Sequence, residues 1–247
     1  PAGNAFIKAF GIDMSQAAQE NIEDYESFNA FFTRVLKDGA RPIADGEKQL
    51  ACPADGTVSQ SGSIKRGRIF QAKGQSFSLQ EVLGGDAKIA EPFMEGKFAT
   101  IYLSPKDYHR LHMPLTGKLK DMIYIPGRLF SVAGHTVRTV PRLFARNERV
   151  ACIFETDAGP MALILVGAIN VAAIETVWAG LVTPGRSKKI KHFNYDNDDI
   201  VLDKGAEMGR FNMGSTVIVL TGKNVNWEFG FSADAPVQMG QGIGKFK

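Results

Sequence analysis

The sequence predicts an α+β fold whose core is mainly antiparallel β-sheet, preceded by N-terminal helices. Three observations support this prediction. From Leu50 onward, short runs of β-forming residues are separated by Gly and Pro. Before that point, apolar residues recur at helical spacing. With 247 residues and 44% hydrophobic content, the chain can also bury a sizeable core without disulfide bonds or bound metal ions.

The N-terminal helices are expected over residues 5–10 and 15–35, where Ser-Phe-Asn-Ala-Phe-Phe gives a strongly apolar face. We therefore expect residues 1–45 to form a helical segment and residues 46–247 a β-rich domain. Two interpretations of Phe6, Ile7 and Phe10 stay open: burial in the core, or insertion into a lipid headgroup layer.

The β-rich domain is expected to contain few helices. Helix candidates are residues 78–83 and the neighbourhood of 105–110. The apolar run at 161–173 is too short to cross a bilayer as a helix and contains Gly167 and Asn170, so buried strands are expected there. Strands are expected at 56–60, 68–72, 97–103, 117–124, 150–156, 161–174 and 215–220.

A Gly-Ser bond stands directly before the last of these strands. Gly214 has no side chain to shield its carbonyl, so the Oγ of Ser215 could attack it and convert the peptide into an ester. Most Gly-Ser-Thr sequences before a strand are plain turns. The alternative interpretation is self-cleavage.

Two other segments supply partners that such a serine needs. Asp55-Gly56 is typical of a tight turn that presents a carboxylate, and the segment Tyr108-His-Arg-Leu-His112 holds two of the four histidines. An Asp that orients a His, which takes the proton of a Ser, forms a triad in any chain order. In the alternative interpretation, the two imidazoles have no catalytic role and only form hydrogen bonds with backbone groups.

The net charge and the cysteine content exclude few classes of protein. The formal net charge of +3 does not indicate a nucleic-acid partner, but it suits an anionic membrane surface. Cys52 and Cys152 match no disulfide or metal framework, which indicates small core residues in a reducing, cytoplasmic setting. His109 and His112 lack a Glu at zinc-helix spacing and precede Pro114, so no metal is expected.

Five segments in order make the sequence similar to phosphatidylserine decarboxylase proenzymes of the pyruvoyl-dependent, bacterial type. They are Asp55-Gly56, Tyr-His-Arg-Leu-His-Met-Pro at 108–114, Phe-Ala-Arg-Asn-Glu-Arg at 144–149, Ile-Glu-Thr-Val-Trp at 174–178 and Met-Gly-Ser-Thr at 213–216. Met213 replaces the family's usual Leu and leaves the Gly-Ser bond intact. The resemblance runs from about Tyr25 to Phe231, and family members commonly carry an apolar segment before this point, so a membrane anchor preceding Pro1 is expected.

The resemblance implies autocatalytic cleavage between Gly214 and Ser215. Ester formation, removal of the Ser215 α-proton and elimination of the Gly214 carboxylate would leave dehydroalanine. Its imine tautomer would hydrolyse, releasing ammonia and leaving a pyruvoyl group at residue 215. His112 would act as the general base held by Asp55, and His109 would assist decarboxylation. The large chain, 1–214, and the small chain, 215–247, would stay together through sheet pairing, since the small chain begins with an apolar strand.

The implied reaction is decarboxylation of phosphatidylserine to phosphatidylethanolamine through a Schiff base with the pyruvoyl group, which serves as the covalent cofactor and electron sink. The implied partners are phosphatidylserine in an anionic membrane and a second copy in a homodimer, with no nucleic acid. The implied location is peripheral, at the cytoplasmic face of the cell membrane. Residues 1–45 would then be a membrane-proximal segment and residues 46–247 the catalytic domain.

Substrate binding needs a cation near the phosphodiester and apolar groups near the acyl chains. Arg138, Arg142, Arg146 and Arg149 follow one another at spacings of four, four and three among apolar residues, and the first three are the substrate-binding candidates. An ordinary solvated face is the alternative.

Two other functions stay open. One is a catalytically inert binding module with a hybrid β fold, in which Ser215 is an intact turn residue. The other is a serine hydrolase that uses the same triad on an external ester, although the usual Gly-x-Ser-x-Gly elbow is absent. Two fragments on denaturing electrophoresis would separate self-cleavage from both.

Overall fold

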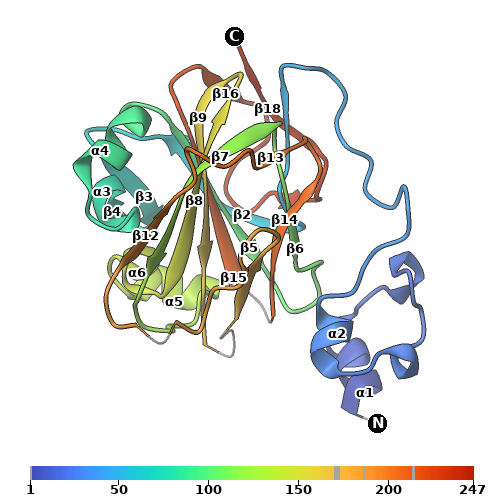
Figure 1. The fold of residues 1–247 in the computed structure, drawn as a ribbon. Coiled ribbons are helices and arrows are strands. Elements are labelled where there is room, and N and C mark those ends of the chain that lie inside the picture. Colours follow the sequence, from blue (N-terminus) through green and yellow to red (C-terminus); the bar gives the residue numbers. More distant parts are fainter. Residues whose placement is uncertain (1, 170–172, 186, 213–214) are drawn as a thin grey trace.

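The computed structural model describes residues 2–169, 173–185, 187–212 and 215–247, and of Ala2 and Ser215 it describes the backbone. A β-rich body carries short helices on its surface, and the N-terminal helices lie at one side of it (Figure 1). The predicted α+β fold with a mainly antiparallel core is confirmed.

Within the described residues, nine strands form the main sheet, and every neighbouring pair is antiparallel. Strand β13 (Val201–Leu202) pairs with β7 beside β12. The other strands, in their order across the sheet, are β12 (Lys191–Asn194), β7 (Gly117–Ile125), β8 (Arg149–Thr156), β9 (Gly159–Val166), β15 (Ser215–Thr221), β5 (Lys97–Leu103), β2 (Gly56–Ser63) and β17 (Pro236–Val237).

Smaller sheets flank the main one. The sheet β11-β10-β14-β6 comprises Gly180–Leu181, Ile174–Thr176, Glu207–Phe211 and Arg110–His112; the sheet β1-β18-β16 comprises Gln49–Ala51, Gly242–Phe246 and Val225–Trp227; and the hairpin β3-β4 comprises Arg68–Ala72 and Gln75–Ser78. The described helices are α1 (Ala2–Phe10), η1 (Met14–Gln16), η2 (Ile22–Asp24), α2 (Phe28–Phe32), α3 (Leu79–Val82), α4 (Ala87–Ala90), η3 (Glu91–Phe93), α5 (Gly134–Thr139) and α6 (Leu143–Arg146).

The core is centred on β9 and β15, whose residues are buried on both faces of the sheet. From Met161 to Val166 and from Thr216 to Thr221 every residue is buried, as the unbroken apolar runs in the sequence predict. β15 pairs with β9 on one side and with β5 on the other. Ser215, its first residue, lies opposite Leu103, the last residue of β5. The strand that follows the predicted cleavage point therefore occupies the middle of the sheet.

Helical structure is expected over residues 15–35, but the structure has short helices there and not one continuous helix. The chain instead forms η1, η2 and α2, separated by extended residues. The side chains of Asp13, Asn21 and Ser27 each accept a hydrogen bond from a backbone N–H two or three residues later. These short polar side chains cap new turns and so compete with one continuous helix.

The helix expected near 105–110 is also wrong. The Asp107 carboxylate accepts hydrogen bonds from the backbone N–H (2.6 Å) and the hydroxyl (2.7 Å) of Ser104, which closes a turn. Arg110 then enters β6 and pairs with β14. The expected strand at 161–174 ends in the structure at Val166, and Ile174 begins β10. Expected strands at 56–60, 68–72, 97–103, 117–124, 150–156 and 215–220 and the helix at 78–83 correspond to β2, β3, β5, β7, β8, β15 and α3.

Cys52 and Cys152 are both buried, which confirms the expectation that they are small core residues. Among the described helices, none has both the length and the apolar character needed to span a bilayer. The division into residues 1–45 and 46–247 stays a prediction, but side chains of the first segment contact the second at the site described next.

Candidate active site

Asp55 stands directly before β2, and its carboxylate is buried, with 6% of the residue exposed. Arg41 holds it: Nε donates to Oδ1 at 2.8 Å and Nη2 to Oδ2 at 2.5 Å. The backbone N–H of Met239 donates to Oδ1 at 2.8 Å. These hydrogen bonds with Asp55 raise the pKa of the Arg41 guanidinium. Sequence reasoning missed Arg41.

Gly56 allows the Asp55 turn to lie against β5. A Cβ at this position would stand 2.2 Å from the backbone oxygen of Tyr102, closer than any packing allows. The turn and the strand end are therefore in direct backbone contact. Asp55, Tyr108 and Arg41 line one cleft of about 310 Å³.

His112 lies on β6, and both of its ring nitrogens have partners. Its Nδ1–H donates to the carbonyl oxygen of Gly205 at 2.8 Å, because a carbonyl can only accept. The hydroxyl of Tyr108 then donates to Nε2 at 3.0 Å. Burial lowers the pKa of His112, so the neutral ring is favoured.

The structure does not bring the Asp55 carboxylate into hydrogen bonding with the His112 ring, because Gly205 and Tyr108 occupy the two ring nitrogens. Burial is the main cause of the lowered pKa of His112. The negative charge of Asp55 raises this pKa weakly. Asp55 thus acts on this ring across space, and a carbonyl fixes the tautomer. Tyr108 and Gly205 were not predicted as its partners.

His109 is fully buried, and its ring contacts Phe32 of α2 in a tilted arrangement, with 4.1 Å between ring centres and 41° between ring planes. Its Nδ1–H donates to the backbone oxygen of Asp107 at 2.7 Å. Nε2 has no hydrogen-bond partner among the described residues. Burial lowers the pKa of His109 to about 3, so the ring is neutral at physiological pH with a free lone pair on Nε2.

The predicted cleavage site lies partly outside the described residues, which include neither Gly214 nor the side chain of Ser215. The backbone nevertheless links this region to the histidines. Ser215 pairs with Leu103 of β5, and the turn that follows β5 leads to His109. The His109 carbonyl accepts the backbone N–H of Phe211, four residues before Ser215, at 3.0 Å.

The three arginines predicted to bind substrate lie on and between α5 and α6, and Arg138 lines a pocket together with Thr57 of β2 and Tyr102 of β5. Arg142 forms an ion pair of 2.8 Å with Glu81, and the Arg146 guanidinium stacks over Phe130 at 4.6 Å. Arg138 is exposed near the end of α5. No described hydrogen bond or ion pair joins these side chains to Asp55 or the histidines. Arg149, the fourth member of the series, is buried and donates to three backbone carbonyls.

The fold is mainly β. Its candidate site combines two neutral histidines, His109 and His112, with the Asp55–Arg41 ion pair near the start of β15. A family model described as phosphatidylserine decarboxylase matches residues 28–245. The chain is 61% identical over 242 residues to a phosphatidylserine decarboxylase proenzyme of Pseudomonas fluorescens strain SBW25, covering 96% of this chain and 84% of that protein.

A proenzyme of the same description from Pseudomonas aeruginosa strain LESB58 is 59% identical over 240 residues, covering 96% of this chain and 83% of that protein. One from Pseudomonas putida strain F1 is 59% identical with the same coverage. The chain belongs to the phosphatidylserine decarboxylase family.

Proposed function

We propose that the protein decarboxylates phosphatidylserine to phosphatidylethanolamine after cleaving itself between Gly214 and Ser215. The observation that carries this proposal is the identity of about 60% with proenzymes of that activity over almost the whole chain. The buried neutral His109, tied to Phe211 shortly before Ser215, supports it.

Cleavage would begin when the Ser215 hydroxyl attacks the Gly214 carbonyl carbon. The peptide C–N bond breaks as the ester C–O bond forms, and the Ser215 proton passes to a base. His112 is our proposed base, because its tautomer leaves Nε2 as the acceptor. The Tyr108 hydroxyl must release Nε2 for this step, so Tyr108 would be a positioning residue.

Loss of the Ser215 α-proton and of the Gly214 carboxylate would then leave dehydroalanine, and water would hydrolyse its imine tautomer to a pyruvoyl group with release of ammonia. The surroundings suit such a group, since they supply an unpartnered buried ring nitrogen on His109 within the described residues. When present, the pyruvoyl group accepts the electrons left by departing CO₂. The lone pair on His109 Nε2 would accept a hydrogen bond from the water molecule that returns a proton to the substrate carbon.

The Asp55–Arg41 pair would keep a negative charge close to His112 without a direct bond. This charge favours a protonated His112 in the cleavage step, as its effect on the pKa indicates. Arg41 would fix the position of that charge. Asp55 is therefore proposed to act electrostatically, not by holding the ring.

We further propose that the enzyme works peripherally at the cytoplasmic face of the cell membrane, as a homodimer. Phe10 and Phe28, 43% and 40% exposed, project from the N-terminal helices and could enter the headgroup layer. Arg138, Arg142 and Arg146 would add attraction to anionic lipid. The exposed positions of Arg138 and Arg142 support this role.

The test combines denaturing electrophoresis with release of labelled CO₂ from phosphatidylserine vesicles. The expected result is two fragments, 1–214 and 215–247, and CO₂ release without added pyridoxal phosphate. An intact chain that releases no CO₂ would contradict the proposal and favour a binding module. Release of free fatty acid from an intact chain would instead indicate a serine hydrolase.

A further inference from the structure

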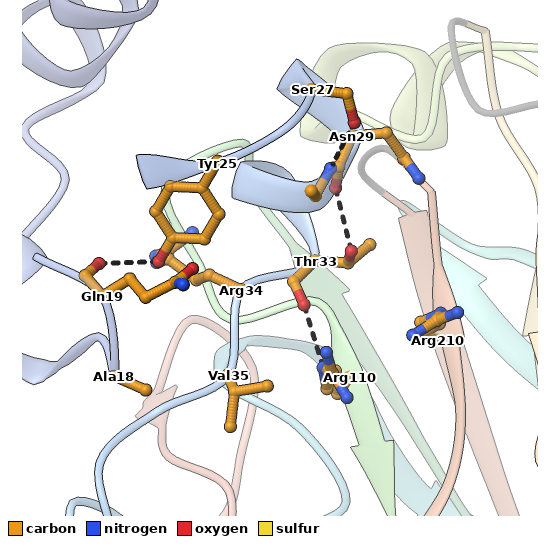
Figure 2. Close-up of a pocket in the computed structure, with 11 residues that line it drawn as sticks. Ala18, Gln19, Tyr25, Ser27, Asn29, Thr33, Arg34, Val35, Arg110 and Arg210 are labelled. Atoms are coloured by element: carbon orange, nitrogen blue, oxygen red, sulfur yellow. Dashed lines mark hydrogen bonds between the residues drawn. The ribbon is translucent and has the colours of Figure 1, made fainter. Parts of the chain in front are cut away.

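A cavity of about 620 Å³ lies between the N-terminal segment and the small sheet that carries His112. Figure 2 shows its lining, with Tyr25, Asn29 and Thr33 from the N-terminal segment and Arg110 and Arg210 from β6 and β14. Its volume suits a small polar ligand or a lipid headgroup. Arg34 lines both this cavity and the cleft that contains Asp55.

Arg34 is a buried cation without an ionic partner among the described residues. Only 5% of the residue is exposed, and Nη2 donates to the backbone oxygen of Lys106 at 3.1 Å. Its Nε and Nη1 are buried and have no partner among those residues. Burial lowers the pKa of this guanidinium, and the Phe31 ring faces it with its centre 5.6 Å from Cζ.

The nearby carboxylates are already engaged. Asp55 is paired with Arg41, and Asp107 accepts two hydrogen bonds from Ser104. Both carboxylates interact with the Arg34 guanidinium only through longer-range electrostatic attraction. A buried charge that its neighbours leave uncompensated is costly, unless a ligand of opposite charge completes the site.

The other two arginines of the cavity are electrically neutralised but keep free donors. Arg110 pairs with Glu207 at 2.8 Å and donates from Nε to the Thr33 oxygen at 2.9 Å. Arg210 pairs with Glu175 at 2.5 Å. Within the described residues, these contacts leave Nη2 of Arg110 and Nη1 of Arg210 unused. The cavity thus has one surplus positive charge and spare N–H groups from two guanidinium groups.

We propose that this cavity binds the phosphodiester of the lipid substrate, with Arg34 supplying the balancing charge and Arg110 and Arg210 the hydrogen bonds. A phosphodiester carries one negative charge, and guanidinium groups suit its oxygens. Arg110 follows His109 directly, and Arg210 lies five residues before Ser215. The inference rests on the proposed function, because it assigns a headgroup subsite beside that active site.

Stability and affinity should change in opposite directions when Arg34 is replaced. Arg34→Met removes a charge that has no partner in the ligand-free protein, so its thermal stability should be unchanged or higher. Arg149→Met is the matched control: it removes a buried arginine that bonds three carbonyls and should lower the melting temperature. A large loss of stability, or failure to fold, in Arg34→Met would overturn the inference.

The binding measurement uses soluble, short-chain phosphatidylserine as substrate. Arg34→Met should still cleave itself but should show a KM raised about tenfold with little change in kcat, the expected scale for a lost charge-assisted contact. Arg34→Lys should recover part of the affinity. Arg68→Gln, an exposed change on the β3-β4 hairpin, should match the wild type. An unchanged KM in Arg34→Met would refute the assignment.

Two probes identify the anion by thermal shift, without any need for activity. Glycerophosphoethanolamine, which has a phosphodiester but no carboxylate, should stabilise the wild type and lose about tenfold in affinity in Arg34→Met. If inorganic phosphate bound equally well, free phosphate and not a lipid would be the ligand. No response to glycerophosphoethanolamine would overturn the subsite even if the wild type decarboxylates phosphatidylserine. A response without CO₂ release would count only against the proposed function.

Discussion

The two sides of the candidate site are held in different ways. On the sheet side, backbone pairing with β5 and β9 fixes the start of β15. On the N-terminal side, individual side chains reach the site: Arg41 binds Asp55, and Phe32 contacts the His109 ring. The sheet side should therefore tolerate substitution structurally, whereas the N-terminal side should depend on single contacts.

The largest expected effect tests the sheet side. Ser215→Ala should give a stable, uncleaved chain, because it removes the proposed nucleophile and leaves the backbone ladder of β15 in place. Intact-mass measurement decides the first point and thermal unfolding the second. Fragments ending at Gly214 would refute the cleavage chemistry, and an unfolded variant would refute the claim that the ladder holds this side.

The two histidines should respond differently. His112→Ala should remain a precursor, whereas His109→Ala should cleave at least partly yet release CO₂ at least about a hundredfold more slowly, the usual scale for a lost proton-transfer group. Electrophoresis and CO₂ release, measured on the same samples, must then disagree for His109→Ala. Equal behaviour of the two variants in both assays would mean that our division of roles is wrong.

The maturation product gives a direct test of the electron sink. With phosphatidylserine present, sodium borohydride should inactivate the mature enzyme and leave a covalent adduct on the chain that begins at residue 215. Mass spectrometry of the separated chains locates the adduct. An adduct on a lysine of the large chain would point to ordinary amine chemistry.

Arg41→Met breaks the strongest single contact of the N-terminal side. It leaves the buried Asp55 carboxylate without its ionic partner and should lower the free energy of unfolding by about 3 kcal/mol. Precursor should also accumulate. The double variant Arg41→Met/Asp55→Asn is the control and should regain part of the stability by urea denaturation. No loss in the single variant would show that this side does not depend on the pair.

Stability should fall in acid because His109 is buried as a neutral ring. Its pKa is about 3 in the folded protein and near the ordinary histidine value of 6.5 in the unfolded chain. The unfolded chain therefore binds more protons below pH 6.5, and stability decreases from there towards pH 3. Between pH 7.5 and pH 5 the expected loss from His109 is about 2 kcal/mol.

Urea denaturation at these two pH values measures that loss. His109→Gln should show a smaller loss than the wild type, and His135→Gln, an exposed change on α5, should show the same loss as the wild type. The lowered pKa of His112 acts in the same direction, so some acid sensitivity should remain in His109→Gln. Equal slopes in all three proteins would contradict burial of a neutral His109.

The smallest effect concerns the exposed arginines. Arg138→Gln should weaken binding to anionic vesicles by about 1 kcal/mol, or roughly fivefold, and the difference should shrink at high salt. Sedimentation with phosphatidylserine vesicles measures it, with neutral phosphatidylcholine vesicles as the control. An effect on KM for soluble short-chain substrate would instead place Arg138 in the active site.

The sequence predicted the parts of the fold that depend on local patterns. Apolar runs such as Met161–Val166 gave the buried strands, because unbroken burial produces them directly. The prediction of continuous helix over residues 15–35 failed because Asp13, Asn21 and Ser27 cap separate short helices.

The site was only partly predictable. Asp55, His109 and His112 came from their motifs, and Tyr108 lies in the same motif as the histidines, but Arg41 and Arg34 lie outside the quoted motifs. Their roles arise from contacts between segments far apart in sequence, as between Arg41 and Asp55. The weak signal available for Arg34 was an arginine that follows Phe31 and Phe32 closely and directly precedes Val35 and Leu36.

The central place of β15 has a consequence for how the mature enzyme could recover from denaturation. An uncut chain carries β15 with it and can refold in a first-order reaction. After cleavage, residues 215–247 are a separate molecule that must be inserted between β5 and β9, so recovery should become second order and slow down on dilution. Maturation would thus turn a chain that folds by itself into one that lasts only as long as it does not unfold.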